Sequence, residues 1–247
     1  MFRRIFVAAL AAGAGIGLLL AALQQVALVP LIQKAENYEH ADPARKAAAA
    51  LPAAGTLSEV LPALIAPAHA HEQHPATTAA EGGSASRTAL TIAATTLVSI
   101  GFAFLLVGAF AVSGRAVDAR EGLLWGIAGF AVFALAPAFG LAPMLPGSAE
   151  ADLVERQIWW LGTAVATAGG IALAVFGRWA WAVPVGIALI AAPQVIGAPH
   201  AEGVGSVPPE LAASFAARSL AVAAVFWVLL GWAAGALYAR LGRTEEA

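Results

Sequence analysis

A carboxylate–imidazole group follows the first apolar stretch of the chain. Glu36, Glu39 and His40 are spaced i, i+3, i+4, so on a helix they share one face. Imidazole nitrogens suit late first-row divalent ions such as cobalt, nickel, copper and zinc. We therefore predict that this face contacts a divalent metal ion. The alternative is a hydrated helix end at a membrane boundary, where acids and histidine are ordinary.

A second group of metal-ligating residues lies in a low-complexity stretch. His69, His71 and His74 stand within six residues of one another and enclose Glu72. In an extramembrane loop such a run gives a weak and unselective metal site, which raises the local ion concentration. The alternative is a solvated run with incidental histidines.

Amide side chains interrupt the apolar segments. Gln24 and Gln25 lie inside the first of them, and Gln25 precedes Glu36 by eleven residues, almost three helical turns. We predict a polar line along this helix that serves as a pathway, with interhelical hydrogen bonding as the alternative. Late in the fifth apolar segment, Gln194 leads to His200, and this amide and imidazole could complete a site with the first helix.

Composition limits the class of protein. The chain is 60% hydrophobic and only 11% charged, whereas soluble domains carry roughly 25% charged residues, so we predict a polytopic membrane protein. The absence of cysteine excludes disulfides and thiolate metal sites. No catalytic constellation and no Walker A loop are present, so we expect no enzyme activity and no intrinsic ATP-driven step. Nucleic-acid binding is implausible with so few basic residues.

Six apolar segments predict an all-α bundle with about six transmembrane helices. We place a first helix at 1–32, an extracytoplasmic histidine-containing loop at 33–88, and a five-helix bundle with a cytoplasmic tail at 89–247. The five later segments are 89–113, 122–141, 158–176, 180–197 and 220–238. We expect 142–157 and 198–219 to be connections, and the short link at 177–179 to close a hairpin. Arg156 is expected to pair with Asp152 or Glu155.

Arginine distribution predicts the orientation. With the N-terminus in the cytoplasm, the two short outer connections contain only Arg156 and Arg218. Seven arginines then lie on the cytoplasmic side: Arg3, Arg4, Arg115, Arg120, Arg178, Arg240 and Arg243. The positive-inside rule therefore favours both termini in the cytoplasm, and all five histidines then fall on the outer side.

Several short motifs, in their order along the chain, resemble the CbtA family of probable cobalt transporter subunits. They are Met1-Phe2-Arg3-Arg4, Gln24-Gln25, Val29-Pro30-Leu31-Ile32, Ala35-Glu36, Tyr38-Glu39, Arg156-Gln157, Trp159-Trp160, Gly177-Arg178-Trp179 and the run 193–199. The resemblance covers most of the chain except residues 41–88. It implies a multi-pass permease of the bacterial inner membrane, with cobalt as substrate and a small single-span partner, CbtB. The chain departs from the family at Gln194, where relatives carry a histidine.

The sequence thus predicts a membrane subunit that captures cobalt, or another divalent transition metal, on the outer side for uptake. We expect no permanently bound cofactor, and lipid, the metal ion and a CbtB-like subunit as partners. Two alternatives stay open: a membrane scaffold that transports nothing, and a permease for an organic cation or another metal such as nickel or zinc.

Overall fold

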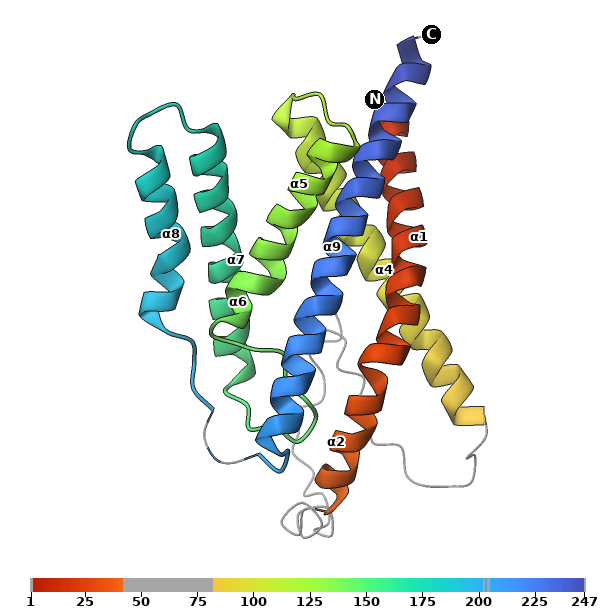
Figure 1. Cartoon of the computed structure of the whole chain (residues 1–247), viewed down its shortest axis with the longest axis vertical. Helices are drawn as coiled ribbons and strands as arrows, with labels where there is room; N and C mark the ends of the chain where they lie inside the picture. Colours follow the sequence, from red (N-terminus) through yellow and green to blue (C-terminus); the bar gives the residue numbers. More distant parts are fainter. Residues whose placement is uncertain (1, 42–81, 202, 204, 247) are drawn as a thin grey trace, which may run out of the picture.

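The structure is a computed structural model that describes residues 2–41, 82–201, 203 and 205–246, without the side chains of 39–41, 82–85 and 244–246. All regular secondary structure in these residues is helical (Figure 1). The elements are α1 (Phe2–Ala27), α2 (Val29–Ala41), α4 (Gly82–Ser113), α5 (Ala119–Phe130), the π-helix η1 (Ala131–Leu135), α6 (Ala136–Ala138), α7 (Leu153–Phe176), α8 (Ala182–Ile196) and α9 (Pro209–Glu246).

Five stretches of these helices are long and apolar enough to cross a membrane, and α8 is a shorter apolar helix. The stretches are α1, Ser86–Ser113, Ala119–Ala138, α7 and Pro209–Arg243. Each of the six predicted apolar segments therefore corresponds to a helical stretch. The prediction of a polytopic all-α membrane protein is confirmed.

Both ends of the chain lie at the same end of the bundle, where the start of α1 meets the end of α9 (Figure 1). The Arg4 Nε donates a hydrogen bond to the Tyr238 carbonyl at 2.7 Å. The Arg4 guanidinium also lies 3.6 Å from the centre of the Tyr238 ring, a cation–π contact. This arrangement agrees with an even number of membrane crossings.

The core lies among α1, α4, α5 and α9, which pack closely because the contact positions are small. Gly122 and Gly126 of α5 lie against Gly231 and Gly235 of α9, where a Cβ atom would collide with the opposite backbone. Small residues permit this approach between membrane helices. An aromatic cluster fills the centre of the same core: Phe102, Phe133, Phe226 and Trp227.

The first helix differs from the prediction, because it breaks at Leu28 and then continues as α2 to Ala41. Pro30 has no N–H, so the Val26 carbonyl loses its helical donor. The Leu31 amide bonds to the Leu28 carbonyl at 2.9 Å, one residue short of the α-helical spacing. Helix also covers 33–41 and 82–88, at both ends of the predicted loop, and the rest of that loop lies outside the described residues.

The connection predicted at 198–219 is wrong in its second half, because α9 begins at Pro209. Proline is favoured in the first turn of a helix, and Glu210 there suits the helix dipole. The buried Phe215 then packs with Leu31, Ala35 and Leu145, which gives this turn of α9 a tertiary partner. At 38 residues, α9 is about 57 Å long and extends beyond the hydrocarbon core.

The connection predicted at 142–157 is shorter, because α7 begins at Leu153. The Asp152 carboxylate caps this helix by accepting hydrogen bonds from the backbone amides of Val154 and Glu155. The prediction for Arg156 is wrong in its partner. The guanidinium pairs with Glu150 in the preceding loop. Asp152 is engaged in capping, whereas Glu150 lies within reach of the guanidinium.

The third apolar segment is not one regular helix. The π-helix η1 lies between α5 and α6, immediately before Pro137. Proline removes the donor that the Phe133 carbonyl would receive in an α-helix, and an irregular turn accommodates the loss. The Gln194 Nε2 donates to the Ala136 carbonyl at 2.9 Å, so the amide ties α8 to this irregular stretch.

Candidate functional site

The two sides of α2 face different helices, and this separates the polar residues that follow α1. Leu31, Lys34 and Tyr38, at i, i+3 and i+7, line a groove between α2 and α9. Glu36 lies on the other side of α2, where it approaches Arg87 of α4. Glu36 and Lys34, two positions apart in the sequence, therefore lie next to different helices.

The Glu36 carboxylate and the Arg87 guanidinium form a loose ion pair, with an N–O distance of 3.9 Å. The Arg87 side chain is 79% exposed and that of Glu36 is 32% exposed. An exposed pair of this kind contributes little to stability. Another cation could therefore replace Arg87 beside the Glu36 carboxylate.

Polar side chains continue along α4 from this ion pair into the membrane-spanning part. Arg87, Thr91, Thr95 and Ser99 recur every four residues, so they form one slowly turning stripe. From Arg87 to Ser99 the stripe covers about 18 Å of helix, against a hydrocarbon core of roughly 30 Å. Thr95 Oγ1 donates to Gln24 Oε1 at 3.3 Å, which joins the stripe to α1. We call Gln24, Glu36 and the four α4 residues the α1–α4 seam.

The hydroxyl groups of the seam are arranged as acceptors. Thr91 Oγ1 donates to the Arg87 carbonyl at 2.9 Å, and Ser99 Oγ donates to the Thr95 carbonyl at 2.7 Å. A hydroxyl has a single proton, so each of these oxygens then presents only lone pairs to its surroundings. Oxygen lone pairs suit a cation.

Glycines close the seam toward the end that holds the termini. Ser99 is 1% exposed and lies against Gly17, where a Cβ atom would be 2.8 Å from the Thr96 Cα. At Gly13 a Cβ atom would be 2.5 Å from the Ile100 Cα. The seam is therefore polar at the end away from the termini, and direct backbone contact closes it at Gly17 and Gly13.

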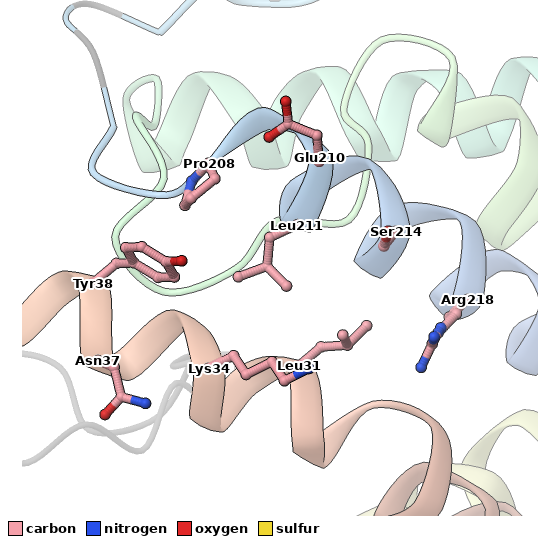
Figure 2. A pocket seen from close by; sticks show the side chains of 9 residues that line it. All are labelled: Leu31, Lys34, Asn37, Tyr38, Pro208, Glu210, Leu211, Ser214 and Arg218. Atoms are coloured by element: carbon pink, nitrogen blue, oxygen red, sulfur yellow. The ribbon is translucent and has the colours of Figure 1, made fainter.

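On the other side of α2, the groove against α9 has a volume of about 610 Å³ (Figure 2). It is lined by Leu31, Lys34, Asn37, Tyr38, Pro208, Glu210, Leu211, Ser214 and Arg218. Two of these residues are basic and one is acidic. In Figure 2 the Glu210 carboxylate points away from α2, so the groove does not present the ligands expected for a bare divalent cation.

The other predicted site residues are only partly described by the structure. Gln25 is half-buried in α1, and His200 is exposed in the loop after α8. Gln194 donates its hydrogen bond to the Ala136 carbonyl. Glu39 and His40 belong to α2, which keeps their backbone on the helical spacing with Glu36, but their side chains are not described. His69, His71 and His74 lie outside the described residues. Within the described part, no three His, Cys, Asp or Glu side chains form a metal-binding group.

Sequence reasoning missed the α4 half of the seam. The signal was available, since Thr91, Thr95 and Ser99 interrupt an apolar segment at a constant spacing of four residues. Hydroxyl residues are common in membrane helices, so this spacing becomes informative only when a polar residue of α1 lies opposite.

The family model for a probable cobalt transporter subunit, CbtA, matches residues 2–239. Searches of curated proteins and of solved structures found no match. The family match covers nearly the whole chain, and with it the seam, the groove and the membrane helices as far as residue 239 of α9. The chain therefore belongs to the CbtA family of probable cobalt transporter subunits.

Proposed function

We propose that this protein is the membrane-spanning subunit that admits cobalt from the extracytoplasmic side, and that the ion enters along the α1–α4 seam. The observations that carry the proposal are the oxygen atoms of the seam: the Glu36 carboxylate beside Arg87, the hydrogen-bonded pair Gln24 and Thr95, and Ser99. The Glu36 carboxylate is partly exposed, and the other oxygens lie in a stretch that is otherwise apolar.

Capture takes place at the acidic face of α2. The ion exchanges part of its water shell for Glu36, Glu39 and His40, and the Arg87 guanidinium moves away from Glu36 as the ion arrives. Because the pair is long and exposed, its replacement costs little. The histidine run at His69, His71 and His74 would raise the ion concentration near this face, with His200 as a further contact.

Passage uses neutral oxygens. In the part of the seam that the structure describes, Glu36 is the only carboxylate. A bare dication is prohibitively costly in hydrocarbon, so the ion keeps most of its water shell and uses Gln24, Thr95 and Ser99 as supplementary ligands. Transport then requires α1 and α4 to separate at Gly13 and Gly17. For Gln25 and Gln194 a pathway role remains a prediction.

The proposed setting is the bacterial inner membrane, with both termini in the cytoplasm. The arginine distribution supports this orientation, and the shared position of the two chain ends agrees with it. A CbtB-like single-span subunit would supply further ligands, because the seam itself offers so few.

The test is radioactive cobalt uptake by cells that express the protein with its small neighbouring subunit. Glu36→Gln keeps the side-chain shape and removes the charge, so we expect uptake to fall roughly tenfold at unchanged membrane abundance. Glu155→Gln is the matched control: Glu155 is an exposed acid on the same side, at the start of α7. It should retain uptake.

Equal uptake by wild type and Glu36→Gln would refute entry at this face. Uptake no higher than in cells without the protein, with the partner present, would refute transport and favour a scaffold. Competition decides the metal: nickel or zinc that blocks cobalt uptake at equal concentration would indicate a permease of broader specificity.

A further inference from the structure

The groove between α2 and α9 has a chemistry opposite to that of the seam, and the proposed cobalt pathway does not use it. Lys34 projects from α2, and Arg218 projects from α9 toward the same end of the groove (Figure 2). Within the described part of the chain, neither is in an ion pair. Two unpaired cations beside one cavity favour an anion.

We propose that this groove binds the phosphate group of a ligand at the outer membrane interface. Arginine matches two phosphate oxygens with its planar fork, and lysine adds a point charge. The Tyr38 and Ser214 hydroxyls line the same cavity and can donate to the remaining oxygens. The single acid, Glu210, points away from α2 (Figure 2).

The depth of the groove favours a phospholipid headgroup over free phosphate. Arg218 stands two residues before Leu220, where the continuous apolar run of α9 begins, so it lies near the hydrocarbon boundary. Basic side chains at this level reach the headgroup layer. Leu31 and Leu211 line the groove as well, and they offer apolar contact to the glycerol and first acyl carbons.

The spacing of the lining residues supports one built site. On α2 they are 31, 34, 37 and 38, and on α9 they are 210, 211, 214 and 218. Each set contains a leucine with polar residues at i+3 and i+7, positions that lie on one side of a helix. Apolar and polar lining therefore come from both helices.

Binding is tested on purified, delipidated protein in neutral detergent. Native mass spectrometry would measure the affinity for phosphatidylglycerol and for the matching diacylglycerol, which lacks the phosphate. Lys34→Gln/Arg218→Gln is compared with Arg240→Gln/Arg243→Gln, a pair of exposed arginines near the end of α9 whose loss changes the net charge equally. We expect phosphatidylglycerol to bind roughly tenfold more weakly to the first double variant and within about twofold of wild type to the control.

A parallel dialysis with radioactive inorganic phosphate identifies the source of the phosphate. Saturable binding that is lost in Lys34→Gln/Arg218→Gln, without phosphatidylglycerol binding, would keep the site and assign it to a free anion. Equal affinity of wild type and this variant for both ligands would overturn the proposal, as would equal losses in the two double variants. Monodisperse Lys34→Arg protein that retains affinity would show that loss of charge, and not misfolding, is responsible. Since the readout is binding, failure here leaves the uptake test independent.

Discussion

The two halves of the α1–α4 interface differ in what holds the helices together. In the half near the termini, Gly13 and Gly17 bring the backbones into contact with Ile100 and Thr96. In the half away from the termini, Gln24 of α1 accepts a hydrogen bond from Thr95, and Glu36 of α2, which continues α1, approaches Arg87. Figure 1 shows the corresponding geometry, in which α4 runs obliquely across α1 and diverges from it toward the end away from the termini.

The difference separates the two requirements of a transport subunit. On the proposed route, the backbone contact would be a barrier to a hydrated ion, and the polar half would supply the ligands. The proposed route is therefore closed toward the termini by the contacts at Gly13 and Gly17. Substitutions in the two halves should therefore have different effects. Those in the half near the termini should disturb helix packing, and those in the polar half should lower the affinity for the ion.

The largest effect is expected in the sealed half. Gly13→Val would force a side chain against the Ile100 Cα and separate the helices, at a cost of about 1–3 kcal/mol. Gly15→Val on the same helix is the control, because a Cβ atom there meets nothing within 4 Å. Thermal unfolding of the monodisperse protein would measure both. Similar melting temperatures for the two variants would contradict the barrier assigned to Gly13.

The next effect concerns the bridge at the boundary between the halves. Gln24→Leu removes the acceptor of the Thr95 hydroxyl and an oxygen of the proposed pathway. We expect cobalt uptake to fall severalfold while the melting temperature changes little, since such membrane hydrogen bonds average only about 0.6 kcal/mol. If stability fell and uptake per folded molecule did not, Gln24 would be a structural residue.

A smaller effect in the opposite direction is expected at the entrance. Arg87→Gln frees Glu36 from its competing cation, so half-maximal uptake should occur at a cobalt concentration about twofold to threefold lower. Arg115→Gln, which neutralises an exposed arginine in the connection after α4, should leave this concentration unchanged. A higher concentration for half-maximal uptake in Arg87→Gln would show that the arginine assists capture.

The smallest effect tests the other amide. Gln194→Leu leaves the Ala136 carbonyl without its donor and should lower the melting temperature by a few degrees, with cobalt uptake per folded molecule unchanged. Reduced uptake at normal stability would instead support the pathway role that the sequence predicts for Gln194.

Much of the fold was predictable because its cause is local. A run of apolar residues must form a helix in a membrane, since hydrocarbon offers no partner to an exposed backbone. The spans, the hairpin of α7 and α8, and the shared side of the chain ends follow from hydropathy and arginine positions alone. Helix capping is also a local effect, and Asp152 is a residue type that favours the start of a helix. The hydropathy of the chain nevertheless placed the beginning of this segment at residue 158, after the observed cap.

The partners of polar residues were not predictable, because several candidates lie within reach in the sequence and only packing selects one. Arg156 pairs with Glu150 and not with the neighbouring acids. Gln24 meets Thr95, which is 71 residues away. Likewise the helical turns of α9 before Leu220 exist because Phe215 finds an apolar cluster that contains Leu31 and Leu145.

The sequence by itself determined that this chain is an α-helical membrane protein of the CbtA family, with a polar exit from its first helix. Only the tertiary structure decided that Glu36 faces α4 while Lys34 faces α9. The physical reason is that helical spacing fixes which residues share a face, whereas the neighbour of each face depends on how distant helices pack. The helix α2 thus contributes an acidic residue to one surface and a basic residue to another.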